Sequence, residues 1–274
     1  MARLALVDLR ANTLKITRSG LIEVLRAQGI AAEPARFSPW GIRISERRLL
    51  TTSAPFRAGL FEIQDEGSQI VAALVDARPN MRVADVCAGA GGKTLALAMT
   101  MDNRGYLLAS DVAAARLEET QRRLNRAGAT CIELRLLTPG DDWRREEATS
   151  FDRVLVDAPC TGAGTWRRDP SARLRLQEAQ LHAALARQAA ILDHAALLVR
   201  IGGRLVYATC SLLFEENEAQ VSGFLSRRPE FQLMPLDRAW PLPGAPPMRG
   251  DFLSLRPFAH DTDGFFAAVM ERLA

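Results

Sequence analysis

Long apolar runs are absent from this sequence of 274 residues. No run approaches the 18 or more residues that a membrane-spanning helix needs, and the N-terminus lacks the pattern of a secretory signal peptide. We therefore expect a cytoplasmic protein that does not enter a membrane. The length fits one large domain and a small one, and 48% hydrophobic with 24% charged residues is ordinary for a globular protein.

Patterns for disulfides and metals are also missing. The four cysteines stand at scattered spacings without a Cys-x-x-Cys pair, which argues against a disulfide framework. The three histidines lie far apart, so we expect no metal site. Lysine is nearly absent, with only Lys15 and Lys93 among 35 cationic residues. Lys93 therefore stands out, because it follows a run of glycines.

Positive charge is concentrated at the N-terminus. Residues 1–57 hold ten Lys and Arg against four Asp and Glu, a local charge of +6, whereas the whole chain carries +3. A basic surplus on a small module suits a polyanionic partner such as RNA. A solvated charged face would have the same composition, so charge alone leaves both interpretations open.

The same N-terminal segment predicts a small α+β module. Residues 4–9 resemble a strand, Thr17 is placed to cap a helix that runs to about Gln28, and 41–44 alternate like a second strand. A linker is expected near residues 53–55, and Asp65 is placed to cap the next helix. We therefore expect two units, a basic RNA-contacting module over 1–57 and a catalytic domain over 58–274.

From residue 82 the pattern alternates between strand and helix, which is typical of a doubly wound, mostly parallel sheet. The expected strands and helices lie at 82–86 (strand), 93–101 (helix), 105–110 (strand), 111–127 (helix), 131–137, 152–157 and 203–208 (strands), 176–199 and 214–226 (helices). Segments 252–255 and 264–270 indicate antiparallel strands that close the sheet. The fold class is therefore α/β, Rossmann-like, with an antiparallel last strand.

A glycine-rich turn follows the first strand of this sheet. The segment Cys87-Ala88-Gly89-Ala90-Gly91-Gly92-Lys93 joins strand to helix, so its backbone can approach a ligand and the helix N-terminus offers free N–H donors. Asp111 ends the next strand, where a carboxylate can accept hydrogen bonds from ribose hydroxyls. Together they indicate a nucleoside-bearing cofactor, although a tight structural turn would explain the glycines alone.

Two cysteines follow strands of the same sheet. Cys160 lies in Asp157-Ala158-Pro159-Cys160-Thr161-Gly162, and Cys210 lies in Ala208-Thr209-Cys210-Ser211. Loops after strand ends form the active site in such sheets. A nucleophilic thiol needs positive charge, hydrogen bonds or a helix N-terminus to stabilise its thiolate, and Arg167 and Arg168 are candidates near Cys160. Cys87 and Cys131 are more typical of packing residues.

These motifs resemble those of the RNA cytosine-5 methyltransferases of the Sun/Fmu (RsmB-like) type. The segment from Asp157 to Pro170 is similar to motif IV, Tyr207 to Glu218 to motif VI, and Cys87 to Lys93 to motif I with Gly89-Ala90 in place of Ala-Pro. Residues 64–69 and 263–266 also match. The resemblance spans nearly the whole chain. These bacterial enzymes often carry an additional helical N-terminal RNA-binding domain, which we do not expect in this chain.

The resemblance implies that S-adenosylmethionine is the cofactor and that RNA is the substrate, and ribosomal RNA is the preferred candidate. By the matching positions Cys210 is the nucleophile that adds to carbon 6 of a flipped cytosine, Cys160 assists product release, and Asp157 binds the pyrimidine edge. The cofactor would contact residues 87–93, Asp111, Asp157 and an acid after the third strand, for which Asp141 is preferred over Asp142. Arg167, Arg168 and Arg173 are expected to contact RNA. We expect a monomer.

Two other interpretations compete. One is a methyltransferase of DNA or of a small molecule, but cytosine-5 DNA enzymes carry their nucleophile in a Pro-Cys-Gln motif, whereas Thr161 follows Cys160 here. The other is a non-catalytic RNA-binding protein, which would need neither cysteine. Within the favoured class, transfer RNA or another RNA remains an alternative to ribosomal RNA.

Overall fold

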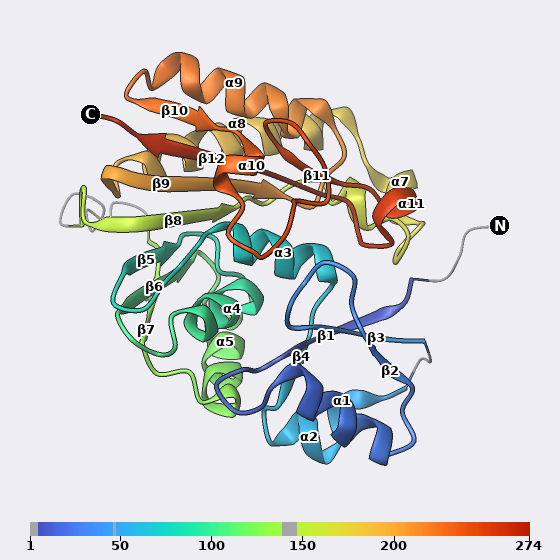
Figure 1. The fold of residues 1–274 in the computed structure, drawn as a ribbon. Helices are drawn as coiled ribbons and strands as arrows, with labels where there is room; N and C mark the ends of the chain where they lie inside the picture. The colour runs from blue at the N-terminus through green and yellow to red at the C-terminus, as the bar shows by residue number, and fades with distance from the viewer. Residues whose placement is uncertain (1–4, 46–47, 139–146) are drawn as a thin grey trace.

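The structure, a computed structural model, describes residues 5–45, 48–138 and 147–274. Its central element is a large sheet with strand order β10-β12-β9-β8-β5-β6-β7, in which β11 pairs with β12 (Figure 1). The strands of this sheet are β5 (Arg82–Asp85), β6 (Tyr106–Asp111), β7 (Ile132–Leu136), β8 (Phe151–Asp157), β9 (Val199–Thr209), β10 (Phe231–Met234), β11 (Leu253–Leu255) and β12 (Phe265–Arg272). The predicted α/β fold class is confirmed.

Strands β7, β6, β5, β8 and β9 are mutually parallel, whereas β12 runs antiparallel to β9. The chain moves outward from β5 in one direction through β6 and β7, and then returns to the other side of β5 through β8. Ligands bind such sheets at the carboxyl ends of the strands, at this point of reversal. The ends of β5, β6, β8 and β9 therefore meet at one edge.

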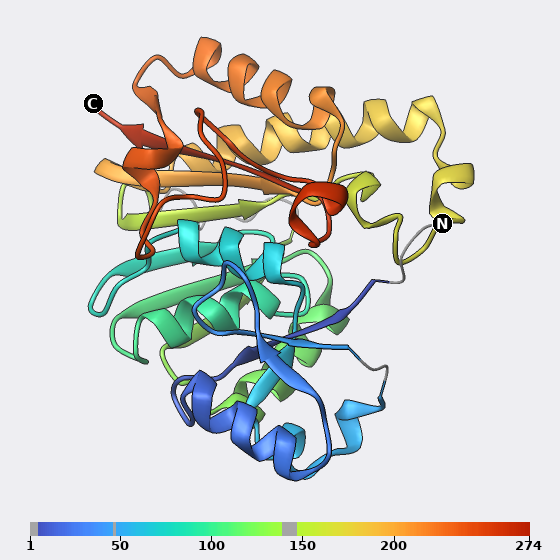
Figure 2. The ribbon, with the colours of Figure 1, turned by 45° about the vertical axis from the view of Figure 1, so that its right-hand side comes forward.

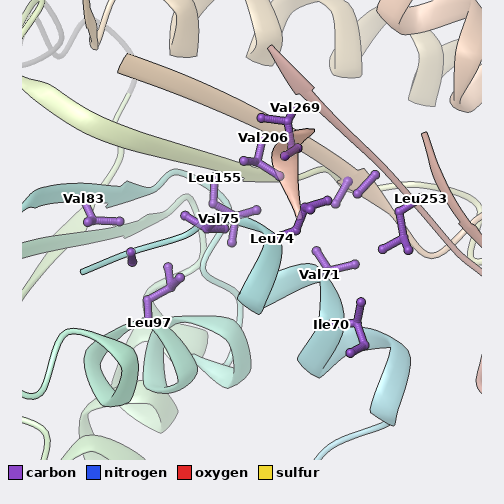
Figure 3. Close-up of a cluster of buried hydrophobic side chains, with 14 of the residues drawn as sticks. Ile70, Val71, Leu74, Val75, Val83, Leu97, Leu155, Val206, Leu253 and Val269 are labelled. Atoms are coloured by element: carbon purple, nitrogen blue, oxygen red, sulfur yellow. The ribbon is translucent and has the colours of Figure 1, made fainter. Parts of the chain in front are cut away.

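Helices cover both faces of the large sheet. One face carries α3 (Glu66–Leu74), α4 (Gly92–Thr100) and α5 (Ala114–Ala127), and the opposite face carries α8 (Glu178–Ala196) and α9 (Glu218–Arg227) (Figure 1). Figure 3 shows the core between the sheet and α3 and α4, where Leu74, Leu97, Leu155 and Val206 are fully buried. Short helical segments lie at η1 (Leu50–Thr52), α2 (Ala54–Arg57), η2 (Ala163–Thr165), α7 (Ala172–Arg175), η3 (Phe214–Glu216), α10 (Leu236–Ala239) and α11 (Pro257–His260).

The N-terminal module is a four-stranded antiparallel sheet with the order β2-β3-β1-β4. Its elements are β1 (Val7–Ala11), α1 (Arg18–Ala27), β2 (Ala32–Pro34), β3 (Gly41–Ile44) and β4 (Phe61–Ile63). The expected Thr17 cap is present, since its side chain accepts a hydrogen bond from the Gly20 amide. Because β4 pairs with β1, the small sheet extends past residue 57.

The small module packs against the same side of the large sheet as α3, α4 and α5, opposite α8 and α9 (Figures 1 and 2). Asn12 donates a hydrogen bond to the carbonyl of Ala127 at the end of α5, and Glu62 forms ion pairs with Arg123 and Arg126 of α5. Buried Arg10 donates to the carbonyl of Gly92. The module is therefore attached directly to the elements that follow the glycine-rich turn.

Some boundaries differ from the sequence prediction. The helix expected at 176–199 covers Glu178–Ala196, and the helix expected at 214–226 is divided into the turn η3 and helix α9, because Asn217 has non-helical backbone angles. Strands β2, β4 and β10 were not predicted. Among the described residues, no helix is both long and apolar enough to cross a membrane.

Candidate active site

A cavity of about 1020 Å³ opens at the carboxyl ends of β5, β6, β8 and β9. The structure brings most of the predicted site residues to its wall: Cys87, Ala88, Gly89, Ala90, Gly92, Lys93, Asp111, Asp157, Cys160 and Cys210. Gly91 does not line the cavity, and Asp141 lies outside the described residues. The glycine-rich turn and both cysteine loops therefore belong to one site.

The glycine-rich turn depends on two residues with positive φ. Gly89 has φ +56° with open space where a Cβ would stand, and its amide donates a 2.9 Å hydrogen bond to Asp111 Oδ2. Gly91 has φ +80°, and a Cβ there would come within 2.7 Å of Thr120 Cγ2 on α5. Glycine at position 91 therefore permits the close approach of α5, and its expected contact with the cofactor stays a prediction.

Asp111 lies at the end of β6 as predicted, and its carboxylate is buried. Oδ2 accepts from the Gly89 amide and Oδ1 accepts from the Ala113 amide, both at 2.9 Å. The next residue, Val112, is 75% exposed and lines the cavity together with Leu137, which follows β7. Neither apolar residue was predicted from the sequence, although the position of Val112 directly after the strand-end acid could have indicated a cofactor contact.

Lys93 and Asp157 form an ion pair at the floor of the cavity. Lys93 Nζ lies 2.6 Å from Asp157 Oδ2, and the Lys93 side chain is 10% exposed. Burial alone would lower the pKa of Lys93, but the charge and hydrogen bond of Asp157 outweigh burial and raise it. Below them, fully buried Asp85 accepts a 2.8 Å hydrogen bond from Thr94, and burial raises its pKa to about 7.

The two strand-end cysteines line the same cavity and contact each other. Their sulfur atoms, Cys160 Sγ and Cys210 Sγ, are 3.4 Å apart. The hydrogen bond from the Cys160 thiol lowers the pKa of Cys210, and the positive charge of Lys93 acts in the same direction. The same hydrogen bond, together with burial and the charge of Cys210, raises the pKa of Cys160. The protonation of either thiol is therefore coupled to that of the other.

Backbone contacts hold the two cysteine loops together. The Gly164 amide donates to the Cys210 carbonyl at 2.9 Å, and the Gly264 amide donates to the Gly164 carbonyl at 2.8 Å. A Cβ on Gly164 would come within 2.2 Å of the Gly264 carbonyl oxygen. Glycine at position 164 thus allows three segments, from β8, β9 and the start of β12, to meet beside the thiols.

The expected role of Arg167 and Arg168 beside Cys160 is wrong. Both guanidinium groups form ion pairs with Asp65 at 2.8 Å, and both also pair with Asp263. Their charge is neutralised by two acids that are distant in sequence, and the cation that favours the Cys210 thiolate is Lys93. Arg173 lies on α7 and is exposed.

The remaining two cysteines lie in different environments. Cys87 lines the cavity beneath the glycine-rich turn, and burial together with the nearby carboxylates raises its pKa. Cys131 is half-buried against the core just before β7. Within the described residues, no group of three or more His, Cys, Asp or Glu side chains is arranged to hold a metal ion.

The parallel sheet, the glycine-rich turn at its point of reversal and the acid at the end of β6 define a Rossmann-like protein that binds a nucleoside-bearing cofactor. The comparisons give the family. The family model described as 16S rRNA methyltransferase RsmB/F matches residues 72–271, and the chain belongs to this family.

Individual relatives agree with this assignment. The chain is 33% identical over 270 residues to a probable ribosomal RNA small subunit methyltransferase B of Synechocystis, covering 97% of this chain and 60% of that protein. It is 33% identical to the ribosomal RNA small subunit methyltransferase F of Cronobacter sakazakii, covering 97% of this chain and 57% of that protein. The chain thus spans about 60% of the length of such relatives.

A solved structure gives the same result for the fold. The crystal structure of a methyltransferase homolog protein from Pyrococcus horikoshii superimposes with a TM-score of 0.83 at 29% identity, covering 99% of this chain and 88% of that chain. The alignment includes the small N-terminal module, since it covers nearly all of this chain. The predicted resemblance to the Sun/Fmu (RsmB-like) family is confirmed.

Proposed function

We propose that this protein methylates carbon 5 of a cytosine in RNA, with S-adenosylmethionine as the methyl donor. The observation that carries the proposal is the pair of thiols 3.4 Å apart beside the Lys93–Asp157 ion pair, at the mouth of a cavity with a glycine-rich wall. Carbon 5 of a pyrimidine is a poor nucleophile, and addition of a thiolate to carbon 6 makes it reactive. Covalent catalysis divides one difficult step into two easier ones.

The cavity residues fit S-adenosylmethionine. The turn from Gly89 to Gly92 presents only glycine and alanine to the cavity, α4 begins there with free amides, and Asp111 presents a buried carboxylate to ribose hydroxyls. Val112 and Leu137 offer apolar contacts to the adenine ring. When bound, S-adenosylmethionine supplies an electrophilic methyl group on a sulfonium.

Cys210 is the nucleophile in this proposal. It is the thiol with the lowered pKa, and Lys93 stabilises its thiolate. The thiolate forms a bond to carbon 6, and the π electrons of the carbon 5–carbon 6 double bond move to carbon 5. Carbon 5 would then take the methyl group, with S-adenosylhomocysteine as the leaving group. Asp157 pairs with Lys93 and lines the same cavity as the thiols, and in this proposal it binds N3 and the amino group of the cytosine.

Cys160 assists the second half of the reaction. Its pKa is raised mainly by the hydrogen bond to Cys210 and by burial, with a further contribution from the Cys210 charge. The hydrogen bond to a thiolate and that negative charge both disappear once the Cys210 sulfur is bonded to carbon 6. Cys160 then loses its own proton to solvent more readily, and its thiolate accepts the proton from carbon 5. The carbon–sulfur bond breaks, and Cys210 leaves as a thiolate.

The RNA is proposed to be ribosomal, because the relatives named above carry ribosomal RNA small subunit methyltransferase names. The proposed RNA-contacting surface comprises the basic module of residues 1–57 and exposed Arg173. Arg168 is 37% exposed at the margin of this surface, whereas Arg167 is 16% exposed and engaged by Asp65 and Asp263. We therefore place Arg167 as the weakest contributor to RNA binding.

The test is methyl transfer with tritiated S-adenosylmethionine to total RNA, to the isolated small ribosomal subunit and to DNA, followed by sequencing of the product. The expected result is label in 5-methylcytosine of RNA with the wild-type chain and none with Cys210→Ala. Label in DNA, or equal label with Cys210→Ala, would contradict the proposal. Binding of the cofactor to both proteins is the control for folding.

A further inference from the structure

One short turn, η3 with the residue after it, contacts both cysteine loops. Glu216 at the end of η3 is fully buried, and its Oε1 and Oε2 atoms accept hydrogen bonds from the Thr161 amide at 2.9 Å and the Thr161 hydroxyl at 2.5 Å. Thr161 directly follows Cys160. Gln188 on α8 donates to Glu216 Oε1 at 3.0 Å and also to the Pro159 carbonyl at 3.1 Å. The residues on both sides of Cys160 are therefore held by one carboxylate and its partner.

The neighbouring residue, Asn217, holds the other loop. Its Oδ1 accepts a 2.6 Å hydrogen bond from the Thr209 hydroxyl, and its Nδ2 donates to the Ser211 carbonyl at 3.0 Å. Thr209 and Ser211 flank Cys210. Asn217 is buried, and its backbone adopts φ −114° and ψ −101°, outside the helical region. The side chains of two consecutive residues thus reach the two thiol-bearing loops.

We infer that Glu216 and Asn217 are positioning residues, an inference that rests on the function proposed above. They set the distance between the two thiols and keep Cys210 in the role of nucleophile and Cys160 in the role of releasing residue. Glu216 fixes the Cys160 loop and places a negative charge beside it, while Asn217 fixes the Cys210 loop. The turn cannot shift alone, because the Tyr207 hydroxyl on β9 donates to the Glu216 carbonyl at 2.6 Å.

The charge of Glu216 gives it a role beyond packing. Within the described residues its hydrogen-bond donors are an amide, a hydroxyl and a carboxamide, so no cation neutralises it directly. The contact with Cys210 and burial are the larger causes of the raised pKa of Cys160, and the charge of Glu216 raises it further. A thiol kept protonated can donate to the Cys210 thiolate, which is the state that attack requires.

Other ionisable groups around Cys160 stay unchanged in the variants proposed below. They come from each neighbouring element: Cys210 and Tyr207 from β9 and its end, Lys93 from α4, Asp157 from β8, Arg175 from α7 and Arg187 from α8. A change in the behaviour of Cys160 can therefore be assigned to the altered residue. Glu215, exposed on the same turn, provides a matched control of equal charge.

The first experiment measures thiol reactivity without RNA. Iodoacetamide alkylation of Cys160 and Cys210 is followed against pH by mass spectrometry in wild type, Glu216→Gln, Asn217→Ala and Glu215→Gln. Glu216→Gln keeps the shape but removes the charge, so alkylation of Cys160 should move to lower pH by about one unit. Glu215→Gln should match wild type. A Cys160 profile unchanged in Glu216→Gln would overturn the electrostatic role.

The second experiment uses RNA and S-adenosylmethionine and separates the two loops. Glu216→Ala should impair release, so that a protein–RNA adduct that survives denaturation accumulates several-fold over Glu215→Gln. Asn217→Ala should slow adduct formation several-fold without accumulation. The reverse pattern, or wild-type behaviour in both, would overturn the positioning roles. If Glu216→Ala does not fold, Thr161→Ala, which removes one loop contact of Glu216 and keeps its charge, should accumulate the adduct instead, and wild-type adduct levels there would overturn the role of Glu216.

The two experiments also distinguish failure of this inference from failure of the proposed function. If wild type and Glu215→Gln transfer no methyl group to RNA, the proposed function fails, and the alkylation profiles still decide what Glu216 does to Cys160. If wild type methylates RNA but all alkylation profiles and adduct levels coincide, the positioning roles fail and the function stands.

Discussion

Replacing Lys93 by methionine removes the only cation that pairs with Asp157 in the described part of the chain, at a separation of 2.6 Å. Breaking a buried ion pair by removing one partner costs about 3–5 kcal/mol of unfolding free energy. Asp157 retains 30% exposure, so water compensates part of the loss. We therefore expect the variant to lose about 3 kcal/mol, at the lower end of that range.

The same substitution acts on the nucleophile. Lys93 lowers the pKa of Cys210 and Asp157 raises it, so Lys93→Met removes the favourable charge and leaves the unfavourable one unpaired. The loss of the Lys93 charge and the unpaired charge of Asp157 both raise the pKa of Cys210. A nearby charge typically shifts a pKa by about 1–3 units, and each unit corresponds to about 1.4 kcal/mol. The pKa of Cys210 should therefore rise by at least about one unit.

The assay is the pH dependence of iodoacetamide alkylation at Cys210, read by mass spectrometry, with urea unfolding of the same samples. Lys93→Arg is the matched control, because it retains the charge and should keep most of the Cys210 reactivity at neutral pH. A folded Lys93→Met protein with an unchanged alkylation midpoint would refute the claim that Lys93 activates Cys210.

Three further predictions concern the cavity, the core and the RNA. Asp111→Ala should weaken S-adenosylmethionine binding about 10–100-fold without unfolding the protein, because it removes a charged hydrogen-bond acceptor. Calorimetry that shows wild-type affinity would remove Asp111 from the site. The folded protein holds the Asp85 proton up to a pKa of about 7, whereas the unfolded chain loses it near pH 4. The stabilisation from this protonated side chain is therefore complete below about pH 4 and declines as the pH rises to about 7. Asp85→Asn should therefore gain stability relative to wild type across that window, by at most about 4 kcal/mol, and a constant difference in urea unfolding at pH 5 and pH 8 would contradict it. RNA affinity should fall steeply with salt, and a flat dependence, or undiminished binding when the basic residues of the small module are neutralised, would refute the proposed RNA surface.

Sequence patterns were sufficient for features set by local chemistry. The Thr17 and Asp65 caps, the end of α5 at Gly128 and the strand-end position of Asp111 all follow from residue type and spacing. The two cysteine loops were placed correctly because parallel strands bring their carboxyl ends to one edge. Their separation of 3.4 Å depends on how the loops pack and could not be read from the chain.

Features set by distant partners were missed. Arg167 and Arg168 looked like free cations near a thiol, yet their partners Asp65 and Asp263 lie about a hundred residues away in either direction. Glu216 fell within the helix predicted over 214–226, and nothing in that pattern indicated that its carboxylate is buried against Thr161. Strand β2, with Pro34 at its end, is too short to show an alternating pattern.

The central claim, that Cys210 forms a covalent bond to the RNA cytosine and Cys160 releases it, is tested most directly by trapping the intermediate. Cys160→Ala is incubated with RNA and S-adenosylmethionine and separated by denaturing electrophoresis beside wild type, Cys210→Ala and the double variant. The account predicts a stable protein–RNA adduct with Cys160→Ala alone, because attack proceeds and elimination stalls. An adduct that accumulates with Cys210→Ala instead, or methylation that neither substitution changes, would contradict it.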